Sequence, residues 1–289
     1  MVDLESLFSL FKREKEYLSY VTPATLRAYD KSWLAFKYHY GCVHVTPTQA
    51  TVEAVMLSWL ESGLAPGAAN SYARSVNSFL SWLAEKRALP ERFRLPLARR
   101  PQKVLRTYSD EDVARILAYA PASRVERRVL ALLTLLVDTG CRINEALTLT
   151  RANCDFDNLL VTLYGKGRKE RRVPISLACR RELFRHLTSH AHALVFCTRD
   201  GKRLSYDNIK RDFLAVLKGA GVEKTEASFH AFRRFFAKWY LKKGGNPIYL
   251  QFLLGHSTMD MTRRYVAEDA EDLRDAHQKL SPLEGLKRR

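Results

Sequence analysis

Apolar residues recur at helical spacing through the first ninety residues, and this periodicity is the strongest constraint on the fold. Leu4, Leu7, Phe8, Leu10 and Phe11 form one apolar stripe. Three more stripes follow, made of Leu26, Tyr29, Trp33 and Phe36, then Val52, Val55, Met56 and Trp59, then Val76, Phe79, Leu80 and Leu83. Helices of this kind bury their stripes against one another, so the sequence predicts a four-helix bundle.

Proline and glycine mark where these helices are expected to begin and to break. Thr22-Pro23 and Thr46-Pro47 each fit an N-cap residue followed by proline at the first helical position. Gly63 and Gly67 are expected to bracket the break before the fourth helix.

Residues 95–107 combine two prolines and four cations with little periodicity, which predicts an extended basic linker. Its cations include Arg99, Arg100 and Lys103. These residues are candidates for contact with a DNA backbone, and a solvated linker would have the same composition.

From about residue 108 the pattern predicts a second domain. Ser109 with Asp112 three residues later resembles a capping box, and Val129–Val137 predicts a buried central helix. Leu159-Leu160-Val161-Thr162-Leu163 and Arg172-Val173-Pro174-Ile175 flank Gly165-Lys166-Gly167, which predicts a hairpin with a lysine at its tip. The expected class is therefore mainly α with a small β-hairpin.

The charge balance favours a polyanionic partner. Lys and Arg number 48 against 31 Asp and Glu, giving a formal net charge of +17. A generally basic soluble protein would show the same excess, so charge alone does not identify the partner.

Membrane, secretory and metal-binding classes are disfavoured. No apolar stretch is long enough to cross a bilayer, and the acidic start Met1–Glu5 lacks the basic region of a signal peptide. The five cysteines (Cys42, Cys141, Cys154, Cys179 and Cys197) have no metal-ligand spacing. We therefore expect free thiols in a reducing cytoplasm, no zinc and no cofactor.

Two cationic clusters in the second domain are candidates for phosphate chemistry. Arg142 follows Thr139-Gly140, where glycine is expected to end a helix, and a cation at the start of the next helix is disfavoured unless an anion is near. Glu145 could orient this guanidinium, or pair with it for purely structural reasons. Lys166 could donate a proton to a departing oxygen.

The neighbours of Lys166 leave its role open. Arg168, Lys169 and Arg171 could follow phosphates, whereas a solvated basic turn would have the same composition. The Walker spacing is absent, which excludes a nucleotide-binding P-loop.

Four further candidate residues follow nearer the C-terminus. His230 and Arg233 are three apart and would share a helix face, and that helix is expected to be anchored in the core by Phe232, Phe235, Phe236 and Trp239. His256 follows Gly255 at an expected helix start, nine residues before Tyr265. A tyrosine hydroxyl with a pKa near 10 is a weak nucleophile, and neighbouring cations favour its ionised form. Each residue alone also fits a structural role.

The order Arg142, Lys166, His230-x-x-Arg233, His256 and Tyr265 resembles the tyrosine recombinase (phage integrase) family, especially its Xer-type members. The resemblance covers nearly the whole chain, since residues 25–36 are also similar to the core-binding domain of the family. It implies a helical (SAM-like) core-binding bundle over residues 1–94, a basic linker over 95–107 and a catalytic domain over 108–289.

The resemblance also implies a mechanism. Arg142 and Arg233 would bind the scissile phosphate, Lys166 would be the general acid, His230 and His256 would assist, and Tyr265 would be the nucleophile. Cleavage would leave a covalent 3′-phosphotyrosyl bond and a free 5′ hydroxyl. Strand exchange through a Holliday junction would need a tetramer, or a paired heterologous recombinase, on two duplexes with inverted-repeat sites. Neither metal nor ATP would be required, and the protein would be cytoplasmic and associated with the nucleoid.

Some features depart from the family pattern or leave alternatives open. Cys141, Asn144 and the pair Val266-Ala267 differ from the residues usual at these positions, without removing a catalytic group. Residues 270–280 predict a helix that could dock on its own domain or on a neighbouring subunit. A type IB topoisomerase, which commonly has lysine in place of His230, and a non-catalytic DNA-binding descendant are the rival functions. The target sequence and the biological role, among them integration and chromosome partition, stay open.

Overall fold

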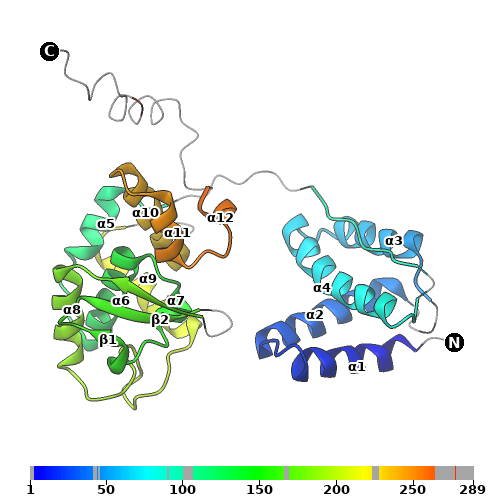
Figure 1. Cartoon of the computed structure of the whole chain (residues 1–289), viewed down its shortest axis with the longest axis horizontal. Coiled ribbons are helices and arrows are strands. Elements are labelled where there is room, and N and C mark those ends of the chain that lie inside the picture. Colours follow the sequence, from blue (N-terminus) through cyan, green and yellow to red (C-terminus); the bar gives the residue numbers. More distant parts are fainter. Residues whose placement is uncertain are drawn as a thin grey trace. The chain divides into compact units, whose positions relative to one another are not determined.

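Helices predominate in the computed structural model of the chain, with one small antiparallel sheet (Figure 1). The structure describes residues 3–41, 44, 46–89, 91–99, 107–165, 169–222, 228–263 and 277. Contacts divide the chain into two compact units, Met1–Val104 and Leu105–Arg289. The expected mainly α class with a small sheet is confirmed. In the described residues no helix has the length and apolar character needed to span a membrane.

The described part of the first unit contains the expected four helices, α1 (Leu4–Tyr17), α2 (Pro23–Tyr40), α3 (Gln49–Glu61) and α4 (Pro66–Glu85). Their apolar stripes meet in an aromatic centre. Phe8 stacks on Trp33 with ring centroids 4.8 Å apart, and it meets Phe79 edge-on at 5.2 Å. Contacts of this geometry add to the free energy gained by burying the rings, so they stabilise the expected bundle.

Two helix starts differ from the sequence expectation. Helix α3 is capped by Thr48 rather than Thr46, because the Thr48 hydroxyl accepts the Thr51 backbone N–H at 3.3 Å. Gly67 lies inside α4 instead of before it, because Pro66 already supplies the helical φ angle at the first position. The expected Thr22 cap is confirmed, with its hydroxyl 3.3 Å from the Thr25 backbone nitrogen.

Residues 95–98, the start of the expected linker, are attached to the first unit by side-chain amides of α4. The Asn77 amide donates to the Leu95 carbonyl at 3.0 Å and accepts the Leu95 N–H at 2.8 Å. Asn70 makes the same paired contact with Ala98, at 2.9 and 2.8 Å. Leu95 itself is buried in the bundle core. An extended backbone that finds no strand partner thus satisfies its polar groups on α4.

The second unit contains α5 (Asp110–Leu117), α6 (Arg124–Thr139), α7 (Ile143–Ala146), a 3-10 turn η1 (Arg151–Asn153), β1 (Cys154–Asp155), β2 (Leu160–Tyr164), β3 (Glu170–Pro174), α8 (Leu177–Leu187), α9 (Tyr206–Gly219), α10 (Phe229–Lys242), α11 (Pro247–Leu254) and α12 (Met259–Arg263). The predicted capping box at the start of α5 is present, with Ser109 accepting the Asp112 N–H and Asp112 accepting the Ser109 N–H. The predicted hairpin is confirmed as β2 and β3, which pair antiparallel with Val161 opposite Val173.

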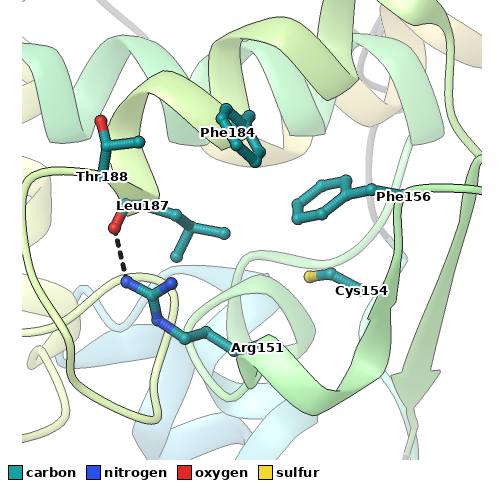
Figure 2. Close-up of a pocket in the computed structure, with 6 residues that line it drawn as sticks. All are labelled: Arg151, Cys154, Phe156, Phe184, Leu187 and Thr188. Atoms are coloured by element: carbon teal, nitrogen blue, oxygen red, sulfur yellow. Dashed lines mark hydrogen bonds between the residues drawn. The ribbon is translucent and has the colours of Figure 1, made fainter.

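A pocket of about 350 Å³ lies in this unit, between α8 and the η1–β1 segment (Figure 2). It is lined by Arg151, Cys154, Phe156, Phe184, Leu187 and Thr188. The Arg151 guanidinium donates to the carbonyls of Leu187 and His192. Burial raises the pKa of the Cys154 thiol to about 12, although the Arg151 charge acts to lower it. The Arg151 guanidinium is thus hydrogen-bonded to backbone oxygens, and the Cys154 thiol is protonated at neutral pH.

We predict that Asn77→Ala lowers the free energy of unfolding of the first unit by about 1–3 kcal/mol, because both Leu95 backbone groups lose their partner in a part-buried place. Chemical unfolding followed by tryptophan fluorescence measures this change, since Trp33, Trp59 and Trp82 belong to this unit. Ser71→Ala, at an exposed position of α4, is the control and should stay within about 0.5 kcal/mol of the wild type. An equal effect of the two substitutions would contradict the anchoring role.

Candidate active site

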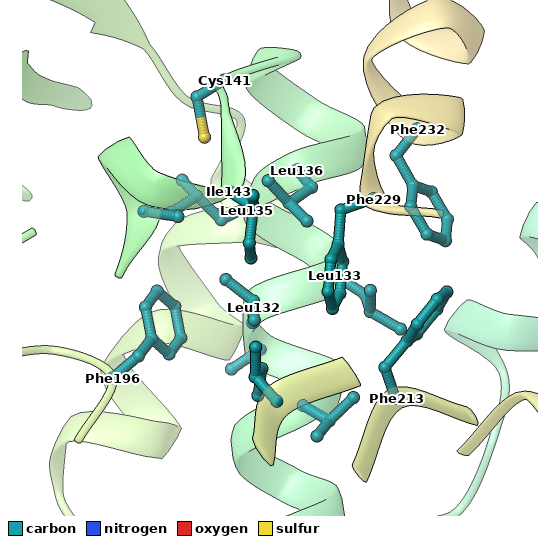
Figure 3. Packing of buried hydrophobic residues seen from close by; sticks show 14 of the residues in the cluster. Leu132, Leu133, Leu135, Leu136, Cys141, Ile143, Phe196, Phe213, Phe229 and Phe232 are labelled. Carbon is teal, nitrogen blue, oxygen red and sulfur yellow. The ribbon is translucent and has the colours of Figure 1, made fainter. Parts of the chain in front are cut away.

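The expected position of Arg142 after a helix-ending glycine is confirmed. Gly140 ends α6 in the left-handed conformation, at φ +61°, and a Cβ at this residue would collide with the Phe236 ring. The chain therefore turns sharply here and begins α7 with Arg142 as its N-cap residue. The turn rests on the central core, where Ile143 of α7 and Phe232 of α10 pack beside α6 (Figure 3).

Glu145 orients Arg142 and is buried, with its side chain 3% exposed. Its Oε1 accepts from Arg142 Nη1 at 2.9 Å, and its Oε2 accepts the Arg142 backbone N–H at 2.8 Å. Arg171 donates to the same carboxylate, with Nη1 3.0 Å from Oε1 and Nη2 2.7 Å from Oε2. Both oxygens thus bind two donors each. Burial acts to raise the pKa of Glu145, but the hydrogen bonds and charges of the two arginines outweigh it and hold the pKa below its usual value.

Arg233 is buried on α10 and binds the ends of two other helices. Its Nη1 donates to the Gly140 carbonyl at 2.9 Å, and its Nη2 donates to the Leu254 carbonyl at 2.7 Å. These oxygens lie at the C-terminal ends of α6 and α11, where carbonyls lack intrahelical partners and the helix dipole is negative. A buried guanidinium is stabilised at such a place, and it fixes α10 relative to both helix ends.

His230 lies one turn before Arg233 on α10, as expected, and is exposed. Desolvation lowers the pKa of its imidazole, and the charges of Arg233, Arg234 and Arg142 act in the same direction. The ring is therefore neutral at neutral pH and can accept a proton. The apolar side of the helix faces the core through Phe232 and Phe235, but Trp239 is 40% exposed and does not anchor the helix as the sequence suggested.

His256 lies in the turn between α11 and α12, not at a helix start, because Gly255 ends α11 with φ +64°. The imidazole is buried, and its Nδ1 is 2.9 Å from the Thr262 hydroxyl. Arg142 Nη2 reaches the Gly255 carbonyl beside it at 3.5 Å. Thr262, which the sequence did not single out, therefore orients this histidine.

Three arginine side chains bind the C-terminal end of α11. Three consecutive carbonyls each accept from a different arginine: Leu253 from Arg171 Nε at 2.9 Å, Leu254 from Arg233 and Gly255 from Arg142. Residues 142, 145, 171, 233 and 256, distant in the sequence, thus meet at one helix end. A concentration of guanidinium groups beside an imidazole is suited to binding a phosphate and to stabilising charge on its oxygens.

Several expected site residues lie outside the described residues: Lys166, Tyr265, Arg100, Lys103 and Arg168. Lys169 and Arg99 are exposed. Gly165, at the base of the hairpin, donates its N–H to the Lys169 carbonyl at 2.9 Å. A Cβ at Gly165 would lie 3.6 Å from Glu145 Oε1, so the hairpin base adjoins the arginine cluster.

Arg171 differs from its expected place among DNA-facing cations. Its side chain is 13% exposed and points to Glu145. On β3, Arg171 shares a face with the buried Val173, whereas Arg172 is exposed. The two-residue alternation of a strand was the sequence signal that could have indicated this inward orientation.

Comparisons with known proteins identify the family of the chain. The model of the phage integrase family matches residues 106–272. Tyrosine recombinase XerC of Chlamydia trachomatis is 27% identical over 295 aligned positions, which cover 97% of this chain and 90% of that protein. Tyrosine recombinase XerD of Shewanella oneidensis is 33% identical over 183 positions, covering 60% of this chain and 61% of that protein.

Solved structures share the fold. The Tn1549 transposon integrase in complex with a circular intermediate DNA has a TM-score of 0.77 at 17% identity, covering 95% of this chain and 99% of that one. A lambda integrase dimer bound to a COC′ core site has a TM-score of 0.75 at 16% identity, covering 93% and 97%.

We predict that Glu145→Gln lowers the melting temperature at neutral pH and that this deficit shrinks in acid. Because the folded-state pKa of Glu145 lies below its unfolded value, the carboxylate contributes stability above the unfolded pKa, and the contribution disappears as pH falls through the folded pKa. Thermal melts from pH 7 to below about pH 4 measure the difference. Glu111→Gln, at an exposed position of α5, is the control. A deficit that stays constant with pH would contradict the ionised pair.

Proposed function

Because the chain belongs to the phage integrase family, we propose that it is a site-specific DNA recombinase that cleaves and rejoins strands through a covalent 3′-phosphotyrosyl intermediate. The observation that carries this proposal is the meeting of Arg142, Arg233 and His256 at the end of α11. The proteins to which the chain is similar are recombinases and integrases, which supports the same activity.

In the proposed cleavage step, the Tyr265 oxygen attacks phosphorus as the bond from phosphorus to the 5′ oxygen breaks. His230, which is neutral, accepts the phenol proton, and Lys166 donates a proton to the departing 5′ oxygen. Arg142 and Arg233 stabilise the charge that develops on the non-bridging oxygens, with His256 assisting. A 5′ hydroxyl from the partner duplex reverses the step and releases the tyrosine.

The remaining parts of the proposal concern assembly. Exchange between two duplexes passes through a Holliday junction and needs four active sites, supplied by a homotetramer or by pairing with a related recombinase on inverted-repeat sites. The guanidinium and ammonium groups take the electrostatic role of a metal, and the phosphotyrosyl bond conserves the energy of the broken bond, so neither metal nor ATP is used. The high positive charge favours association with DNA.

The decisive test replaces the proposed nucleophile. With target DNA recovered by crosslinking the protein to genomic DNA, Tyr265→Phe should abolish covalent capture on a nicked duplex because no phenol oxygen is available, while duplex binding persists. Gel analysis under denaturing conditions measures capture. Tyr249→Phe, at an exposed position of α11, is the matched control and should capture normally. Capture by Tyr265→Phe at the wild-type level would refute the assignment. Relaxation of supercoiled DNA without a target site would favour a topoisomerase.

The lowered pKa of His230 predicts how cleavage depends on pH. Because desolvation and nearby arginines keep the imidazole neutral below its ordinary pKa near 6.5, capture should persist into mild acid and fall only as pH passes through the lowered pKa. Single-turnover capture rates measured across this range test the expectation. In His230→Gln, the fall of the capture rate in acid should disappear. In the control His44→Gln, which lies in the first unit, the fall should remain. If the capture rate of His230→Gln fell in acid as that of the wild type does, the His230 imidazole would be excluded as the cause.

A further inference from the structure

Arg171 belongs to the group of arginines at the end of α11, and the proposed chemistry assigns it no role. All three nitrogens of its guanidinium are engaged: Nη1 and Nη2 with Glu145, and Nε with the Leu253 carbonyl. The side chain is 13% exposed, against 35% for Arg142. Arg171 is thus less accessible to a ligand than Arg142.

The charges around Glu145 explain why two arginines are needed. One carboxylate faces two guanidinium groups, so the three side chains carry a net charge of one positive unit. Without Arg171, Glu145 and Arg142 would form a neutral pair, and the buried carboxylate would bind the Arg142 guanidinium more tightly because it would no longer be shared with a second guanidinium. The Arg142 charge would then be less available to a phosphate.

Glycine at position 255 shows that the site accommodates Arg171. A Cβ on Gly255 would lie 3.1 Å from Arg171 Nη1 and 3.2 Å from its Cδ and Cζ, which is closer than ordinary contact. Gly255 therefore lets the guanidinium lie against the end of α11 while its Nε donates to Leu253. Since Arg171 belongs to β3, this contact also attaches the base of the β2–β3 hairpin to the turn that carries His256.

We propose that Arg171 is a positioning residue for strand cleavage: it neutralises Glu145, so that Arg142 keeps its charge for the scissile phosphate, and it fixes the lysine-bearing hairpin to α11. This inference rests on the proposed recombinase function, in which Arg142 binds that phosphate. Arg171 would therefore increase the rate of strand cleavage and would have little effect on the affinity for DNA.

The first experiment compares Arg171→Met with Arg172→Met. Both variants lose one charge from the same strand, but Arg172 is exposed. Covalent capture on a nicked duplex is measured at saturating DNA, and affinity for the same duplex is measured separately. Arg171→Met should slow capture by roughly tenfold or more, the scale expected when one partner of a buried ion pair is removed. Arg172→Met should alter only affinity. Equal capture rates for the two variants would overturn the inference.

A second variant separates charge neutralisation from a general structural role. If Arg171 acts by neutralising Glu145, then Glu145→Gln added to Arg171→Met removes the uncompensated carboxylate and should restore several-fold of the lost rate. A structural defect would deepen with the second substitution, so a double variant slower than Arg171→Met would overturn the charge argument.

Charge-retaining variants keep the test valid if Arg171→Met does not fold. Arg171→Lys retains the charge but cannot fork onto both Glu145 oxygens, so it should capture more slowly than Arg172→Lys at saturating DNA. Wild-type capture by Arg171→Lys would overturn the positioning role. Failure of the wild-type chain itself to capture DNA would instead refute the proposed function on which the inference rests.

Discussion

The C-terminal end of α11 is the point on which the candidate site depends. Its last carbonyls have no partners within the helix, and three arginines from β3, α7 and α10 donate to them in consecutive order. The negative end of the helix dipole stabilises this accumulation of charge. Arg171, Arg142 and Arg233 would otherwise repel one another. One helix end therefore brings together side chains that are separated by up to 91 positions in the sequence.

Glu145 is the second requirement, because it sets how much of this charge is available. Its carboxylate is fully bonded to Arg142 and Arg171, and the pair of cations keeps it ionised despite burial. Arg233 is stabilised differently, by hydrogen bonds to the carbonyls of two helix ends. The arrangement thus combines one buried cation bonded to neutral oxygens with a triad that carries one net positive charge. Such a site can accept a phosphate without first losing an internal ion pair.

Local sequence signals predicted the elements well where the physical cause is itself local. The Thr22 cap, the Ser109–Asp112 capping box and the β2–β3 hairpin each depend on residues a few positions apart, and all were found. The misplaced cap at Thr46 and the start of α4 failed because a competing local signal was stronger. The exposed position of Trp239 was not predicted for another reason, since periodicity does not reveal which surface a residue meets. Nor does composition reveal that the extended residues 95–98 bind side-chain amides of α4.

The sequence by itself determined the helical bundle, the hairpin, the positive charge and the order of Arg142, His230, Arg233 and His256, because these follow from spacing and residue type. Only the tertiary structure decided which cations face inward. Arg171 and Lys169 are alike in charge and close in sequence, yet Arg171 is buried against Glu145 and Lys169 is exposed. The difference arises from packing, since Arg171, unlike the exposed Lys169, meets the turn after α11, where Gly255 lacks a side chain.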